Sequence, residues 1–140
     1  MLFVVIGKRL SGKTYFIENR MNEIKNYDTK RRVKFFSAFQ TDMTSSEFLN
    51  LVINHRHTSS EVDFDDMVIE VCGLNDLPLE VRNNAYYMIF TDYDNMQKYF
   101  IDPSHGGYSA SIIKTITQVN KFHSERYQVC VWDNWNKKFI

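Results

Sequence analysis

The sequence predicts an α/β fold with three layers, in which a mostly parallel central sheet carries helices on both faces. Short apolar runs alternate along the chain with segments whose apolar residues recur at helical spacing. The first run, residues 2–6, contains no polar residue, which is typical of a strand buried on both faces of a parallel sheet. A chain of 140 residues supplies one ordinary core, so we expect residues 1–140 to form a single domain with this strand at its centre.

The elements after the first strand alternate between strands and helices. Further strands are expected at the apolar runs of residues 33–39, 67–72, 85–91 and 127–132. Helices are expected at residues 14–25, 44–52, 96–100 and 112–119, where apolar residues recur every three or four positions. The helix at residue 44 opens on Thr44-Ser45-Ser46-Glu47, which fits a capping box. This βα alternation favours a parallel sheet.

Composition and charge favour no particular macromolecular partner. Lys plus Arg and Asp plus Glu both total 17, so no field of the whole molecule attracts nucleic acid or a membrane surface. The apolar start is far shorter than the roughly 20 residues of a membrane span and lacks a signal-peptide layout. We therefore expect an intracellular protein without membrane contact. Cys72 and Cys130 lie in apolar runs, so we expect both to be interior free thiols.

The segment after the first strand carries the most specific motif. Residues 7–14 read G-K-R-L-S-G-K-T, which fits the phosphate-binding pattern G-x-x-x-x-G-K-[ST]. Such a loop turns its backbone N–H groups toward phosphate oxygens at the start of a helix, while the lysine reaches the β and γ phosphates and the hydroxyl binds Mg²⁺. We expect a nucleoside triphosphate to be bound by Gly7, Lys8, Arg9, Leu10, Ser11, Gly12, Lys13 and Thr14.

A magnesium-binding carboxylate is expected at the end of a neighbouring strand, because ligands gather at the carboxyl ends of parallel strands. Asp92 follows the apolar run of residues 87–91 and is the first candidate. Glu70 and Asp133 compete with it, since each lies at or near the end of another run. Asp92 also precedes the predicted helix at residues 96–100, so its alternative role is a helix cap.

Hydrolysis also needs a group that orients or activates water. Tyr93 stands where many P-loop ATPases have glutamate, so Asp94 or Glu70 would have to supply that group. Asn134, just past the last predicted strand, is a candidate for contact with the γ phosphate or the attacking water. The predicted catalytic residues are Lys13, Asp92, Asp94 and Asn134, and the predicted metal ligands are Thr14 and Asp92.

The wording of residues 5–14 resembles the phosphate loop of the FtsK/HerA-type genome-packaging ATPases of poxviruses, giant viruses and some phages. Residues 88–96 look like the magnesium-binding strand of that family, and residues 112–122 with Arg126 and residues 128–134 look like its polar sensor region. The resemblance implies a small version of the P-loop NTPase fold, because the chain stops at Ile140 without the final strand and helix of such motors. It also implies an arginine finger, for which Arg126 and Arg82 are candidates.

The resemblance implies a Mg²⁺-dependent ATPase that packages or moves double-stranded viral DNA. Such a protein would work as a ring of identical subunits or with partner viral proteins, in the host cytoplasm or the virion. Residues 30–32 and 137–138 are basic and are candidates for DNA contact. A nucleotide-gated scaffold with little turnover is one alternative, because the glutamate after Asp92 is missing. A small-molecule kinase with residues 94–107 as its lid is the other.

Overall fold

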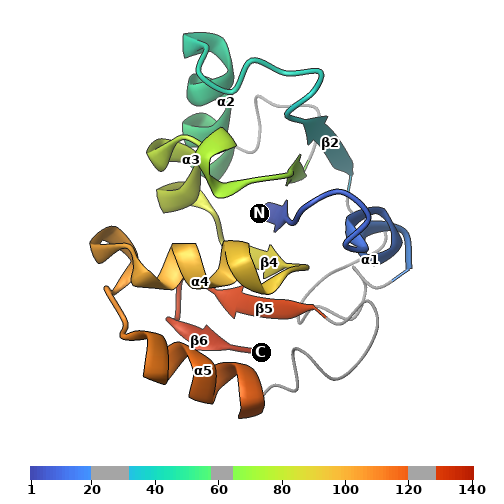
Figure 1. The fold of residues 1–140 in the computed structure, drawn as a ribbon. Helices are drawn as coiled ribbons and strands as arrows, with labels where there is room; N and C mark the ends of the chain where they lie inside the picture. The colour runs from blue at the N-terminus through green and yellow to red at the C-terminus, as the bar shows by residue number, and fades with distance from the viewer. Residues whose placement is uncertain (20–31, 58–64, 120–128) are drawn as a thin grey trace.

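The structure is a computed structural model that describes residues 1–19, 32–57, 65–119 and 129–140. Its strands are β1 (Leu2–Ile6), β2 (Val33–Ser37), β3 (Asp66–Val71), β4 (Tyr87–Phe90), β5 (Cys130–Asp133) and β6 (Lys138–Phe139). They form one six-stranded sheet in the order β2-β3-β1-β4-β5-β6 (Figure 1). β1 lies between β3 and β4 and runs parallel to both, which confirms the predicted central strand.

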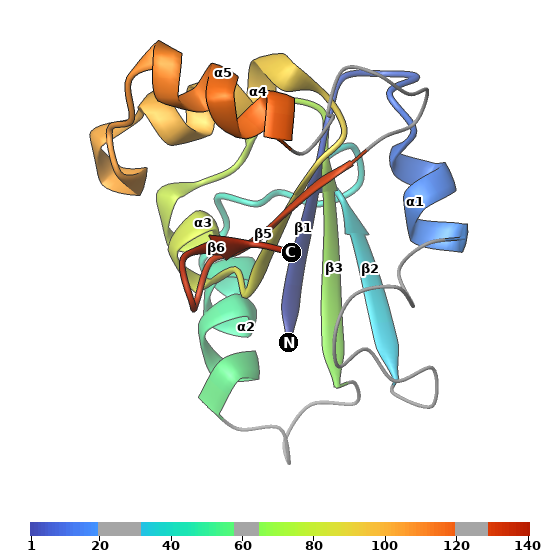
Figure 2. The ribbon, with the colours of Figure 1, turned by 90° about the horizontal axis from the view of Figure 1, so that it is seen from below.

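Helices cover both faces of this sheet. They are α1 (Lys13–Asn19), α2 (Ser46–His57), α3 (Leu79–Asn84), α4 (Tyr93–Ile101) and α5 (Ala110–Val119), with short 3₁₀ helices η2 (Leu74–Asp76) and η3 (Pro103–His105). Figure 2 shows α1 on one side of the sheet and α2 to α5 on the other. Among the residues described, no helix has the length and apolarity needed to cross a membrane.

Alternating residues of β1 feed two cores, as the twofold period of a strand requires. Phe3 and Val5 pack with Phe16 of α1 in the smaller core. Val4 and Ile6 point to the other face, where the larger core includes buried side chains of α2 to α5. The predicted α/β fold with a mostly parallel sheet is therefore confirmed.

The last two strands are joined to the sheet by antiparallel pairing, and β5 is the strand that runs opposite to the others. β5 pairs antiparallel with β4, and β6 pairs antiparallel with β5. The carboxyl ends of β1, β3 and β4 therefore lie together at one end of the sheet. β5 runs the other way, so its carboxyl end lies at the opposite end, where Asp133 is beside Tyr87 at the start of β4. An apolar run predicts a strand but not its direction, and the expected role of Asn134 assumed that this strand is parallel to the others.

Two local predictions need correction. The capping residue of α2 is Ser45 and not Thr44: the Ser45 hydroxyl accepts a hydrogen bond from the Phe48 N–H at 3.2 Å, whereas the Thr44 hydroxyl donates to Asp42 at 2.6 Å. Residues 94–107 do not form a lid, because α4 belongs to the larger core, where Tyr99 is fully buried.

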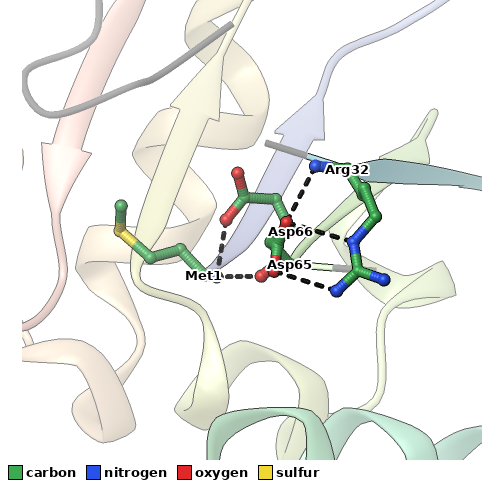
Figure 3. Close-up of polar contacts among 4 residues, drawn as sticks. All are labelled: Met1, Arg32, Asp65 and Asp66. Carbon is green, nitrogen blue, oxygen red and sulfur yellow. Dashed lines mark hydrogen bonds and ion pairs between the residues drawn. The ribbon is translucent and has the colours of Figure 1, made fainter. Parts of the chain in front are cut away.

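An ion pair fastens the starting ends of the central strands (Figure 3). The N-terminal ammonium of Met1 donates to the fully buried carboxylate of Asp66 at 2.7 Å and to the carbonyl of Asp65 at 2.9 Å. The Asp65 carboxylate in turn accepts from the backbone N–H of Arg32 at 2.9 Å. These contacts join the amino-terminal ends of β1 and β3 and the residue before β2. They lie at the end of the sheet opposite residues 7–14.

Candidate phosphate-binding site

The loop of residues 7–12 leaves the end of β1 and enters α1 directly. Leu10 and Gly12 have positive φ angles of 62° and 96°, so the bend uses left-handed backbone at both positions. Gly7 has a different reason to be glycine, because a Cβ there would overlap the side-chain oxygens of Thr91 and Ser11. Those two hydroxyls share a hydrogen bond of 2.6 Å, which ties the loop to the end of β4.

The backbone of this loop presents unused donors. Within the part of the chain that the structure describes, no hydrogen bond engages the N–H groups of Arg9, Leu10, Gly12, Lys13 or Thr14. These groups lie at the N-terminus of α1, where helix geometry leaves donors without internal partners. The arrangement suits an anion with several oxygens, such as a chain of phosphates.

Lys13 is only 7% exposed, an unusual burial for a lysine. Its ammonium group donates to the carbonyl of Gly7 and to that of Lys8 at 3.1 Å. The Sγ atom of Cys72, at the end of β3, lies 3.8 Å from the same nitrogen. The lysine is thus held folded over the loop, with its charge beside the unused N–H groups.

A cavity of about 500 Å³ opens beside the loop. Lys13 and Thr14 line it from the loop side, and Glu70 and Cys72 line it from β3. Phe39, with 81% of its side chain exposed, stands at its rim. The cavity therefore brings Thr14, the predicted source of a hydroxyl ligand, together with an acidic strand residue. That residue is Glu70, which the sequence analysis treats only as a competitor of Asp92.

Asp92 is the N-cap of α4, the alternative role considered for it. Its Oδ1 atom accepts from the Asn95 N–H at 2.8 Å. Its Oδ2 atom accepts from the Lys8 N–H at 2.7 Å and from the Asn95 side-chain amide at 2.8 Å. Both carboxylate oxygens are thus occupied by protein donors, and Asp92 does not line the cavity beside Lys13 and Thr14. The geometry supports a positioning role for Asp92 and not the expected place on the metal.

Asn95 is a site residue that the sequence analysis missed. Its side chain accepts from the Leu74 N–H at 2.9 Å and donates to the Cys72 carbonyl at 3.2 Å. Together with Asp92 it joins the loop, the end of β3 and the start of α4. The spacing D-x-x-N at a helix start was the available signal, because capping partners lie three residues apart.

The other predicted residues lie away from the loop. Asp94 is exposed on the first turn of α4. Asn134 lies at the opposite edge of the sheet, where its side chain contacts the carbonyl of Ala85 at 3.0 Å and the Tyr99 hydroxyl at 3.1 Å. Its expected contact with a γ phosphate assumed a strand ending at the loop, which the antiparallel β5 does not do.

Asp133, the other candidate magnesium ligand, and Arg82, a candidate arginine finger, also lie away from the loop. Asp133 accepts from Asn136 N–H at 2.9 Å in the turn between β5 and β6. Arg82 donates to the Leu77 carbonyl at 2.9 Å and belongs to α3, which leads into the start of β4. Arg126 lies outside the described residues.

A second cavity, also of about 500 Å³, adjoins the first through the shared residues Phe39 and Cys72. Its lining includes the carboxylates of Asp42 and Asp76. Among the residues that the structure describes, no lysine or arginine lines it. It therefore suits a ligand that donates hydrogen bonds better than one that carries phosphate.

The two cysteines are free thiols in different surroundings. Cys130 is buried, and this burial raises the pKa of its thiol. Cys72 is only half-buried and lines both cavities. The expectation of free thiols is confirmed, although Cys72 belongs to the candidate site and not to the deep interior.

Solved structures with a similar fold include those of a viral genome-packaging NTPase. The genome-packaging NTPase B204 of Sulfolobus turreted icosahedral virus 2, in complex with ATP-gammaS, matches with a TM-score of 0.62 and 11% identity over 99% of this chain and 95% of that one. The AMPPCP complex of that protein matches with a TM-score of 0.61 and 10% identity over the same shares. B204, the DNA-packaging ATPase of Sulfolobus turreted icosahedral virus, matches with a TM-score of 0.54 and 10% identity, covering 99% of this chain and 95% of that one.

At this identity the likeness shows that the chain shares its fold with B204. No protein-family model and no curated protein sequence matches the chain.

Proposed function

We propose that the protein binds ATP with Mg²⁺ at the loop of residues 7–14 and hydrolyses it. The observation that carries this proposal is the set of unused N–H groups around the buried ammonium of Lys13. A buried cation with unpaired backbone donors beside it is costly without an anion to bind, and a triphosphate supplies several charged oxygens. Lys13 would then exchange its contacts with loop carbonyls for the β and γ phosphates.

The residues present fit a magnesium site of the kind that depends on substrate phosphates. Mg²⁺ usually keeps several waters and takes only one or two protein ligands beside nucleotide. Thr14 is exposed in the cavity and would provide a hydroxyl, and the described residues contain no cluster of three or more metal-binding side chains. When bound, the ion would neutralise charge that develops on the transferred phosphoryl group.

The finer proposal is a role in viral DNA packaging or translocation. It is supported by the fold shared with B204, a genome-packaging NTPase, and by the resemblance of the loop to packaging ATPases. Double-stranded DNA and further copies of the chain or other viral proteins are the partners this role requires. Of the two basic patches, residues 30–31 lie outside the described residues, and Lys137 donates to the Asn134 side chain at 2.9 Å beside the β5–β6 hairpin.

A second candidate function is phosphoryl transfer to a small hydroxyl-bearing acceptor. The cavity lined by Asp42 and Asp76 favours it, because this cavity adjoins the proposed γ-phosphate position and a carboxylate can accept the proton of an acceptor hydroxyl. In that reaction the acceptor oxygen would bond to the γ phosphorus as the bond to the β-phosphate oxygen breaks, and ADP would leave.

Release of inorganic phosphate from Mg²⁺-ATP separates these functions. The packaging proposal predicts hydrolysis that double-stranded DNA stimulates. A kinase would consume ATP only with a nucleoside or other hydroxyl acceptor and would yield a phosphorylated product. ATP binding without turnover under any of these conditions would leave the nucleotide-gated scaffold as the function.

A further inference from the structure

We propose that Glu70 is the carboxylate that holds Mg²⁺, through water, opposite Thr14. The proposal rests on the proposed ATP site and replaces the expected assignment of this role to Asp92. In P-loop NTPases the loop hydroxyl and a strand carboxylate hold the ion together. Two acidic residues lie near the loop beside β1, Glu70 of β3 and Asp92 just after β4. The surroundings of the two carboxylates differ.

The register of β3 places Glu70 on the face of the sheet that carries α1. Glu70 is the Cα partner of Val5 in β1, and Val5 belongs to the smaller core with Phe16 of α1. Val68, two residues before Glu70, belongs to the same core, as the alternation of side chains along a strand requires. The face that Glu70 occupies is therefore the one from which Lys13 and Thr14 begin α1, and all three residues line one cavity.

The Glu70 carboxylate is also available. Within the described residues the carboxylate takes part in no hydrogen bond or ion pair. The backbone of Glu70 is engaged in the sheet, and its carbonyl also accepts from the Ala38 N–H at 3.1 Å. Asp92, just beyond the end of β4, has both oxygens bonded to Lys8 and Asn95. The Glu70 carboxylate can therefore accept from metal-bound water without losing a protein hydrogen bond, whereas that of Asp92 cannot.

Electrostatics gives a reason for a cation between Glu70 and a bound nucleotide. A carboxylate in the same cavity as the γ phosphate would repel it, since like charges a few ångströms apart disfavour each other strongly where water is partly excluded. A divalent ion between the two groups turns this repulsion into attraction on both sides. Glu70 should therefore weaken binding of metal-free ATP and strengthen binding of Mg²⁺-ATP.

The test is calorimetric titration of ATP into wild type and Glu70→Gln, once with EDTA and once with excess Mg²⁺. Glutamine keeps the size and removes the charge. For Glu70→Gln we expect metal-free ATP to bind at least as tightly as to wild type. We expect the gain in affinity from Mg²⁺ to shrink by roughly 10- to 100-fold, the usual effect of losing a group that supports a metal. Glu80→Gln, an exposed carboxylate on α3, is the matched control and should behave as wild type.

The outcomes separate this proposal from the proposed function. A Glu70→Gln variant with the full Mg²⁺ effect would overturn the role of Glu70 while leaving the ATP site in place. Loss of affinity in EDTA as well as in Mg²⁺ would overturn it too, because Glu70 would then support the loop structure. A wild-type protein that binds no ATP in either buffer would refute the ATP site itself.

Discussion

Replacing Asp92 with alanine tests whether this carboxylate positions the loop or holds the metal. The change removes the N-cap of α4, which costs about 1 kcal/mol of stability in typical helices. It also strips the Lys8 N–H and the Asn95 amide of their acceptor at a site where Asp92 is only 8% exposed. An unsatisfied buried donor costs about 1–3 kcal/mol. We therefore expect Asp92→Ala to lower the free energy of unfolding by about 2–4 kcal/mol.

Asp92→Asn should fall between wild type and alanine. Asparagine is an effective N-cap, so the bond from the Asn95 N–H can remain. One carboxylate oxygen becomes an amide NH₂ group, however, and this donor would face either the Lys8 N–H or the donors of Asn95. We expect the stability of this variant to drop by about 1.5–3 kcal/mol, the usual scale for one lost bond to a charged acceptor.

Urea denaturation followed by circular dichroism measures these differences. Asp94→Ala is the matched control, since Asp94 is exposed on the same helical turn, and it should cost at most about 1 kcal/mol through the helix dipole. Nucleotide affinity should fall with stability in the Asp92 variants, because the Lys8 anchor of the loop is lost. An Asp92→Ala protein that is as stable as wild type and binds ATP equally well, but turns it over more slowly, would contradict the positioning role. Asp92 would then be assigned as a Mg²⁺ ligand.

Three further predictions follow from the loop and its surroundings. Gly7→Ala should abolish ATP binding in calorimetric titration, because the added Cβ has no space. Gly73→Ala is the control and should bind ATP as wild type does, since the nearest contact of its Cβ would be an ordinary 3.5 Å. Equal ATP affinity of the two variants would contradict this. A thiol reagent should label Cys72 and spare the buried Cys130 in the native protein, and Mg²⁺-ATP should slow the labelling seen by mass spectrometry; labelling unaffected by nucleotide would count against the site. His105 has its pKa lowered from the usual 6.5, first by burial and then by the nearby arginine, so the unfolded chain binds its proton more readily. Stability should therefore fall as pH drops below about 6.5, and His105→Gln should reduce that fall in urea titrations, with an unchanged pH profile as the contrary result.

The parts of the fold that could be predicted from the sequence are those set by local pattern. The uninterrupted apolar residues 2–6 indicated the central strand, and the glycine spacing of residues 7–14 indicated a loop between that strand and a helix. Both features depend on neighbouring residues alone. The α/β layering followed because helical and strand periods alternate along the chain.

The parts that could not be predicted from the sequence depend on contacts between distant segments. The direction of β5 depends on the path of the chain before it, and that direction takes Asn134 away from the loop. Asp92 met both the pattern of a metal-binding strand end and that of a helix cap. Its bond from the Asn95 N–H is that of a cap, and its bond from the Lys8 N–H, 84 positions away, could not be read from local pattern. Glu70 lies inside its strand, so register with β1 was needed to place it on the α1 face.

Calorimetric titration of Mg²⁺-ATP into wild type and Lys13→Ala tests the central claim, that the loop of residues 7–14 binds a triphosphate. The Lys13 side chain contacts loop carbonyls and the Cys72 sulfur, so its removal should leave the fold intact and delete the main charge at the phosphates. Lys114→Ala, an exposed lysine on α5, serves as the control. The account predicts saturable binding to wild type and to the control, and an affinity at least about tenfold lower for Lys13→Ala, a loss of about 1.4 kcal/mol. Equal affinity of all three folded proteins, or no binding to wild type, would contradict it.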